Sequence, residues 1–168
     1  MAETTQDLSF MDEAMALALQ AQAIGEIPVG AVVVHNGEIV GRGYNQSITL
    51  NDPSAHAEML AIREAGKTLG NYRLLDCTLY VTLEPCPMCA GLLVHSRIKR
   101  LVYGAKDEKT GSAGSIMDLT NHVALNHKIE AQQSSRAEQC SAMLSAFFKQ
   151  RRKEIKALKA EKRANAQD

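Results

Sequence analysis

The 168-residue sequence lacks the apolar segments that mark membrane and secreted proteins. Its longest apolar runs are far too short to span a bilayer. Its first seven residues contain neither a basic segment nor an apolar core of the kind that begins a secretory leader, so we expect a cytoplasmic protein. Internal repeats and low-complexity linkers are also missing. Because hydrophobic residues make up 45% of the chain, we expect a single globular domain over residues 1–168 rather than a disordered chain.

Cysteine is scarce, and the four cysteines do not form the pattern of a zinc ribbon. In a cytoplasmic protein, cysteines are more often metal ligands or buried thiols than disulfide partners. Cys77 lies in an apolar run and Cys140 lies on an apolar helical face, so we expect both to be core thiols. Cys86 and Cys89 form the one Cys-x-x-Cys pair of the sequence. Because a ribbon needs a second such pair, that class of structural site is excluded.

The sequence has no net charge, but its basic residues are concentrated at one end. The 19 lysines and arginines balance 19 aspartates and glutamates. Residues 149–168 nevertheless hold eight basic and three acidic residues, a net charge of +5, which leaves −5 for residues 1–148. A basic tail of this kind is a candidate for binding phosphate groups. The alternative is a solvated helix end whose charges serve solubility.

The pattern of apolar residues predicts an α/β domain. Asn36-Gly37 between two β-rich runs is a strong hairpin signal. We predict four helices: one over 8–24, one that starts after 52–54 and stops near Gly66 or Gly70, one that begins at Cys86, and a long one from 135 into the tail. The predicted strands cover 29–34, 38–44, 77–83, 98–103 and 128–132. Residues 104–115 are predicted to form a loop. Strand-helix-strand units of this kind favour parallel neighbours.

Two short motifs, thirty residues apart, carry the candidate chemistry: His56-Ala57-Glu58 and Cys86-Pro87-Met88-Cys89. Together they supply one imidazole, two thiols and one carboxylate. The histidine and the two cysteines would give zinc three protein ligands and leave a fourth position for water, which is the arrangement of catalytic zinc. Zinc lowers the pKa of such a water toward about 7. Glu58 is then free to act as the proton shuttle.

The spacing within each motif suits the start of a helix. Cys86 and Cys89 are three residues apart and so face the same side of a helix, and a helix N-terminus lowers the pKa of a thiol. Pro87 fits a first helical turn, where its missing N–H costs nothing. His56 and Glu58 would point to opposite sides in mid-helix, so both reach one pocket only if a helix begins there. We therefore expect two helix N-termini to meet over one metal ion.

Beyond these motifs, nearly the whole chain resembles the bacterial tRNA-specific adenosine deaminases of the cytidine deaminase-like superfamily. His-x-Glu followed by Pro-Cys-x-x-Cys is the known signature of zinc deaminases that act on nucleobases. The similar segments are Pro28–Val34, Asp52–Glu58, Leu79–Cys86, Met88–Gly91, His95–Ile98, Gly104–Asp107 and Phe147–Arg152. The resemblance implies hydrolytic deamination of the wobble adenosine, position 34 of the anticodon, to inosine, usually in an arginine tRNA with anticodon ACG.

The same resemblance implies a fold and an assembly. The fold is a three-layer α/β/α sandwich with a five-stranded mixed sheet and helices on both faces. The implied assembly is a homodimer with one zinc ion per subunit.

The resemblance also assigns roles to individual residues. It implies that His56, Cys86 and Cys89 are the zinc ligands and that Glu58 is the proton donor. For the substrate, it implies that Asn45 contacts the adenosine and that Val29 and Leu83 form walls of the base pocket. It also implies that Asp107 lies next to the RNA strand, and it makes Arg151 and Arg152 in the basic tail candidate RNA contacts. Two alternatives stay open. Asn45 is also a plausible turn residue after a strand, and Asp107 is also explained as a solvated loop acid.

Two rival functions share much of this sequence evidence. The first is a deaminase of the same superfamily that acts on a free base or nucleoside, such as cytidine or guanine. The basic tail and the extent of the resemblance argue against it. The second is a non-catalytic, zinc-stabilised RNA-binding subunit. Such chains typically lose the glutamate, whereas Glu58 is present here.

Overall fold

The computed structural model describes residues 2–167, and it has the predicted order of helices and strands. The elements are α1 (Thr5–Ala23), β1 (Gly30–His35), β2 (Glu38–Tyr44), α2 (Ala57–Leu69), β3 (Cys77–Leu83), α3 (Pro87–His95), β4 (Arg100–Ala105), β5 (Glu130–Gln133) and α4 (Ala137–Ala166). The strand predicted over 98–103 lies two residues later, and the other boundaries agree within a few residues. None of the helices in this part of the chain is long and apolar enough to cross a membrane.

The five strands form one mixed sheet in the order β2-β1-β3-β4-β5. β1 pairs antiparallel with both β2 and β3, and β3, β4 and β5 are parallel. The predicted hairpin joins β1 to β2. Its two turn residues, Asn36 and Gly37, have φ angles of 51° and 78°, the left-handed conformation that a two-residue hairpin turn requires. The five-stranded mixed sheet expected from the resemblance is therefore confirmed.

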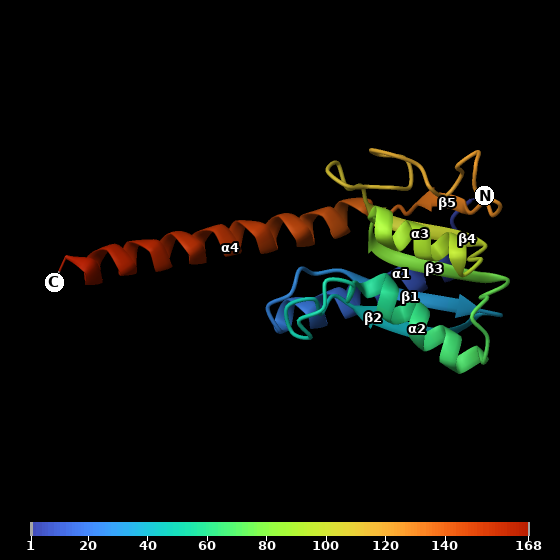
Figure 1. The fold of residues 1–168 in the computed structure, drawn as a ribbon, viewed down its shortest axis with the longest axis horizontal. Helices are drawn as coiled ribbons and strands as arrows, with labels where there is room; N and C mark the ends of the chain where they lie inside the picture. The colour runs from blue at the N-terminus through green and yellow to red at the C-terminus, as the bar shows by residue number, and fades with distance from the viewer. Residues whose placement is uncertain (1, 168) are drawn as a thin grey trace.

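Helices cover both faces of this sheet, which makes a three-layer α/β/α sandwich (Figure 1). Side chains alternate along β1, as the two-residue period of a strand requires. Val32 and Val34 pack with α1 on one face, and Ala31 and Val33 pack with α2 on the other. Cys140 of α4 lies in the first of these cores. The central strands are thus buried on both sides, and their ends are left to carry the loops.

Helix α2 packs directly against the sheet where Gly43 of β2 faces it. A Cβ atom at Gly43 of β2 would lie 2.3 Å from the Ala57 carbonyl oxygen and 2.7 Å from the Ala61 nitrogen. No larger residue fits at this distance. The contact involves the first turn of α2, so it sets the position of that turn relative to the sheet.

A buried carboxylate ties α1 to the sheet. Asp7 forms a capping box with Thr4 at the start of α1. It also accepts hydrogen bonds from the Tyr80 hydroxyl at 2.5 Å and from both terminal nitrogens of Arg100, at 2.7 and 2.9 Å. The hydrogen bonds from Arg100 hold the pKa of Asp7 well below its usual range. One side chain therefore joins α1 to β3 and β4.

Helix α4 starts against the body of the protein, and its C-terminal part projects away from it (Figure 1). Its first turns pack on β4, where Gly104 makes room for the Cys140 side chain. Further along, Arg151 donates a hydrogen bond to the Gly25 carbonyl oxygen at 2.7 Å. Residues 152–167 are exposed. The basic tail predicted from the sequence is therefore a projecting helical arm.

Candidate functional site

The two sequence motifs lie at the starts of α2 and α3. His56 is the N-cap of α2 and Cys86 is the N-cap of α3, and both have extended backbone angles. Pro87 occupies the first position of α3, and Cys89 lies within its first turn. The expected meeting of two helix N-termini is confirmed.

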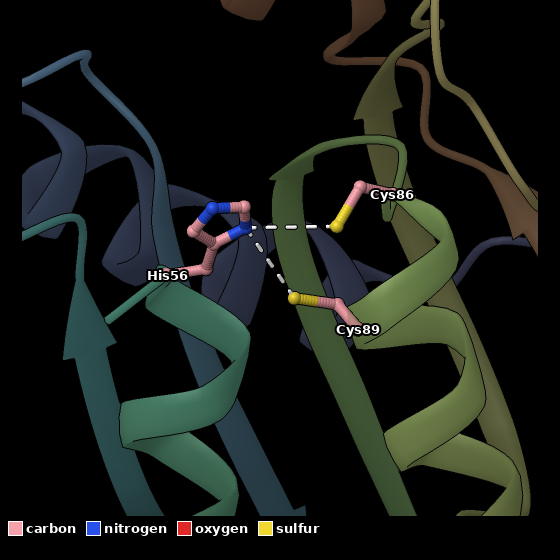
Figure 2. A group of neighbouring side chains, drawn as sticks. All are labelled: His56, Cys86 and Cys89. Carbon is pink, nitrogen blue, oxygen red and sulfur yellow. Dashed lines mark hydrogen bonds between the residues drawn. The ribbon is translucent and has the colours of Figure 1, made fainter. Parts of the chain in front are cut away.

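The three candidate metal ligands are close together (Figure 2). The His56 Nδ1 atom lies 3.6 Å from the sulfur of Cys86 and 3.6 Å from the sulfur of Cys89. A tetrahedral zinc ion with bonds of about 2.0–2.1 Å to nitrogen and about 2.3 Å to sulfur separates these ligands by about 3.5 Å. Cys89 is buried, whereas the other two side chains are only partly covered. The donor set, its spacing and its open side therefore fit catalytic zinc.

The three candidate ligands share protons through their mutual hydrogen bonds. A hydrogen bond from Cys89, with help from His56, lowers the pKa of the Cys86 thiol to about 4. The same hydrogen bond raises the pKa of Cys89. Hydrogen bonding to Cys86 also raises the pKa of His56. A zinc ion binds thiolates and neutral imidazole, so its binding would displace the protons that these groups share.

Glu58 is the second residue of α2 and is only 4% exposed. It lines the same pocket as His56. Burial raises the pKa of its carboxyl group. The structure thus places a buried acid in the same pocket as His56. This is the arrangement that we expected if a helix begins at His56.

A pocket of about 260 Å³ opens beside these groups. This is slightly smaller than the range of about 300–1,000 Å³ that holds drug-sized ligands, which suits a single flat base. The pocket is lined by seven residues proposed from the sequence: Val29, Asn45, His56, Glu58, Leu83, Cys86 and Asp107. The structure therefore brings the predicted base pocket together.

The Asn45 side chain also caps helix α2. Its Oδ1 atom accepts a hydrogen bond from the Ala57 N–H at 2.9 Å. His56 itself makes no capping hydrogen bond with its side chain, so Asn45 supplies the acceptor that the helix start needs. Asn45 also lines the pocket, and with its oxygen used in this way the amide nitrogen remains available as a donor. Asn45 is therefore more than a turn residue.

Asp107 lines the pocket but also organises its own loop. Its carboxylate accepts hydrogen bonds from the Lys109 and Thr110 N–H groups, at 2.9 and 3.2 Å, and from the Thr110 hydroxyl at 2.9 Å. Burial opposes ionisation of Asp107, but these hydrogen bonds outweigh it and lower its pKa. The side chain is half-buried. Asp107 is thus an ordered part of the pocket rim and not simply a solvated acid.

The two candidate arginines of the tail differ. Arg151 is half-buried, hydrogen-bonded to Gly25 and stacked over the Phe147 ring with 5.0 Å between the guanidinium carbon and the ring centre. Its guanidinium holds α4 against the loop after α1. Arg152 is exposed. Of the pair, Arg152 is the one whose charge faces solvent.

Sequence reasoning missed two buried acids that line the pocket, Glu26 and Glu84. Glu26 accepts hydrogen bonds from the N–H groups of Ile48 and Thr49, at 3.2 and 2.7 Å, and from the Thr49 hydroxyl at 2.7 Å. It thereby holds the loop that follows Asn45. The adjacent Cys-x-x-Cys motif could have drawn attention to Glu84, but no local pattern marks Glu26.

Comparison with known proteins identifies the family. The profile described as the cytidine and deoxycytidylate deaminase zinc-binding region matches residues 4–105. The tRNA-specific adenosine deaminase of Haemophilus influenzae is 53% identical over 155 residues, which cover 92% of this chain and 90% of that protein. The corresponding protein of Bacillus subtilis is 50% identical over 153 residues, covering 91% and 95%.

The fold comparison agrees. A solved structure from a study of A-to-I editing by tRNA:A34 deaminases at the wobble position of transfer RNA superposes with a TM-score of 0.79. It is 38% identical in sequence, and the match covers 82% of this chain and 99% of that one. By sequence and by fold, the chain belongs to the tRNA-specific adenosine deaminases, within the wider zinc-binding cytidine and deoxycytidylate deaminase family.

Proposed function

We propose that this protein hydrolyses the wobble adenosine, position 34 of a tRNA anticodon, to inosine, and that an arginine tRNA with anticodon ACG is a substrate. The observation that carries the proposal is the placement of a His/Cys/Cys triad and a buried Glu58 around one base-sized pocket. His56, Cys86 and Cys89 would hold the zinc ion. The family membership supports both the metal and the reaction.

The chemistry needs one water molecule and a mobile proton. Zinc, when bound, supplies a water that ionises near neutral pH. The Glu58 carboxylate would take a proton from that water and pass it to a ring nitrogen while the water oxygen bonds to the carbon that carries the amino group. It would then take the proton of the new hydroxyl group and give it to the amino group, so that the C–N bond breaks and ammonia leaves. Water and adenosine are consumed, and inosine and ammonia are produced. The buried position of Glu58 beside the ligands is what this shuttle requires.

The pocket selects one unstacked base. Val29 and Leu83 line it as apolar walls. The amide nitrogen of Asn45 would donate to an acceptor on the base, because the Asn45 oxygen already accepts from the Ala57 N–H. A base in a stacked helix cannot enter such a pocket, so it must flip out. An anticodon loop makes this inexpensive, which favours RNA hairpin loops as substrates.

Groups outside the pocket would contact the rest of the RNA. Asp107 at the rim is a candidate acceptor for a ribose 2′-hydroxyl, the group that separates RNA from DNA. Arg152 and the exposed arm of α4 are candidates for phosphate contacts. Arg151 would act indirectly, by holding the arm in place. We also propose that the protein acts in the cytoplasm as a homodimer. Light scattering of the purified protein would test the dimer.

The test is a deamination assay on a defined RNA. Zinc-loaded protein is incubated with arginine tRNA bearing an ACG anticodon, and the RNA is sequenced for inosine. Inosine at position 34 alone is the expected result. If zinc is bound and the tRNA is folded but no inosine forms, the proposal is wrong. Release of ammonia from free cytidine or guanine under the same conditions would then favour a small-molecule deaminase.

Substitution of Glu58 separates an enzyme from an RNA-binding subunit. Glu58→Gln removes the shuttle while keeping the size of the side chain, so turnover should fall by a factor of at least about 10². Zinc content and tRNA affinity should stay unchanged. Glu64→Gln, on an exposed face of the same helix, is the matched control and should retain the wild-type rate. Wild-type turnover in Glu58→Gln would refute the shuttle assignment.

A further inference from the structure

Glu84 is a buried acid for which the proposed chemistry has no use. It follows directly after β3, stands two residues before Cys86, and is 1% exposed. Within residues 2–167, none of the three ion pairs involves it. A buried carboxylate is costly unless its oxygens are hydrogen-bonded. Its partners therefore show what it does.

All four hydrogen bonds to the Glu84 carboxylate come from one loop, residues 107–115. One oxygen accepts from the Asp107 N–H at 3.2 Å and from the Ser115 hydroxyl. The other accepts from the N–H groups of Ala113 and Ser115, at 2.9 and 3.1 Å. The loop thus wraps its backbone N–H groups around a single anion. Hydrogen bonds to a charged acceptor are among the stronger ones in proteins.

The loop also packs against this carboxylate without space for a side chain. A Cβ atom at Gly111 would lie 2.5 Å from the Glu84 carboxyl carbon and 2.4 Å from the Asp107 carbonyl oxygen. The Ser112 N–H donates to the Pro85 carbonyl oxygen at 2.8 Å. The loop is therefore attached at both residues that lead from β3 to the metal-ligand motif.

This attachment joins two parts of the pocket. Asp107 and Thr110 of the loop line the pocket together with Cys86. We infer that Glu84 is a positioning residue for the RNA substrate: it fixes the loop over residues 107–115 to the segment that carries the zinc ligands. The inference rests on the proposed function, because the loop is taken to contact the RNA strand. Glu84 acts through the loop and does not touch the reacting atoms.

Glu84→Gln tests this with almost no change in size. In either orientation of the glutamine amide, its NH2 group would face backbone N–H groups that now donate to Glu84. These are the N–H of Asp107 on one side and the N–H groups of Ala113 and Ser115 on the other. Two donors that face each other cannot form a hydrogen bond. The loop should then open more often. Ser115→Ala is a milder second variant, since it removes one donor and keeps the carboxylate. Glu38→Gln is the matched control, because Glu38 is an exposed acid at the first position of β2.

The first measurement is hydrogen exchange of the zinc-loaded proteins without RNA. Amides of Asp107, Ala113 and Ser115 should exchange about tenfold faster in Glu84→Gln, with a smaller increase in Ser115→Ala. Amides of β4 should be unchanged in both variants. Unchanged exchange in the loop would overturn the inference, and this result does not depend on any activity.

The second measurement separates positioning from a merely structural role. With tRNA as substrate, Glu84→Gln should raise KM about tenfold while kcat and zinc content stay near the wild-type values, because it removes binding contacts and not chemistry. A lower kcat or lost zinc at unchanged KM would overturn the inference. If the wild-type protein does not deaminate tRNA, the proposed function fails, and the exchange data still decide whether Glu84 holds the loop.

Discussion

Asp7→Asn should destabilise the protein far more than an ordinary surface substitution. The Asp7 carboxylate receives two hydrogen bonds from Arg100, one from Tyr80 and one from the Thr4 N–H. The side chains of Arg100 and Asp7 are 13% and 5% exposed. An asparagine of the same shape cannot neutralise the guanidinium, which would be left buried without its counter-charge.

The expected size of this effect follows from that burial. Removing one partner of a buried ion pair costs about 3–5 kcal/mol, mostly because the other charge remains unpaired. For a protein of this length, each kcal/mol lowers Tm by about 2–4 °C, so Tm should fall by about 6–20 °C. Asp12→Asn on the same helix is the matched control. Asp12 pairs with Arg136, but its side chain is 54% exposed, so its loss should cost less than about 1 kcal/mol.

Acid dependence gives a second check on the same pair. The folded-state pKa of Asp7 is lowered from the unfolded value of about 3.9. Its stabilising contribution is therefore complete above about pH 4 and is lost as the pH falls through the folded-state pKa. Urea unfolding at several pH values should show the gap between wild type and Asp7→Asn shrinking below about pH 4. If the Tm of Asp7→Asn lies within 2 °C of that of the Asp12→Asn control, this account of the Asp7–Arg100 pair is wrong.

Three further predictions concern the site and the arm. Gly43→Ala should push the first turn of α2 from the sheet, because its Cβ would meet the Ala57 oxygen at 2.3 Å; metal analysis should show reduced zinc, and full occupancy would contradict this. Glu26→Gln should loosen the loop it holds and raise KM for tRNA with zinc retained; an unchanged KM would count against that anchor. Deleting residues 152–168 should weaken tRNA binding and flatten its salt dependence; equal affinity across a salt titration would exclude a phosphate role.

The fold could be predicted from the sequence because its signals are local. Asn36-Gly37 marks the hairpin, and Gly70 ends α2 with the left-handed φ of 65° typical of a helix C-terminus. The candidate metal triad was predictable for a related reason. The spacing of Cys86 and Cys89, with a proline at the first helical position, is compatible with one geometry in which both sulfurs face the same way.

The missed features depend on contacts between distant residues. Glu84 bonds to residues 23 to 31 positions later in the chain, and Arg151 bonds to Gly25 across 126 positions. Irregular loops have no periodicity from which such contacts can be predicted. The charge of Arg151 suggested phosphate binding, and in the fold its guanidinium also donates a hydrogen bond to the Gly25 carbonyl oxygen. The sequence shows a charge, and only the fold shows whether that charge is already engaged.

The pocket therefore combines two kinds of support with different consequences. The candidate zinc ligands and Glu58 stand at the starts of α2 and α3, and the contact at Gly43 shows that α2 packs directly against the sheet at its first turn. Two loops also border the pocket: Glu26 holds the loop after Asn45, and Glu84 holds the loop over residues 107–115. Because neither carboxylate bonds to a zinc ligand, a change in either loop can alter substrate binding while the metal ligands stay in place. Errors in helix packing, by contrast, displace the metal ligands and so impair the reaction for every substrate.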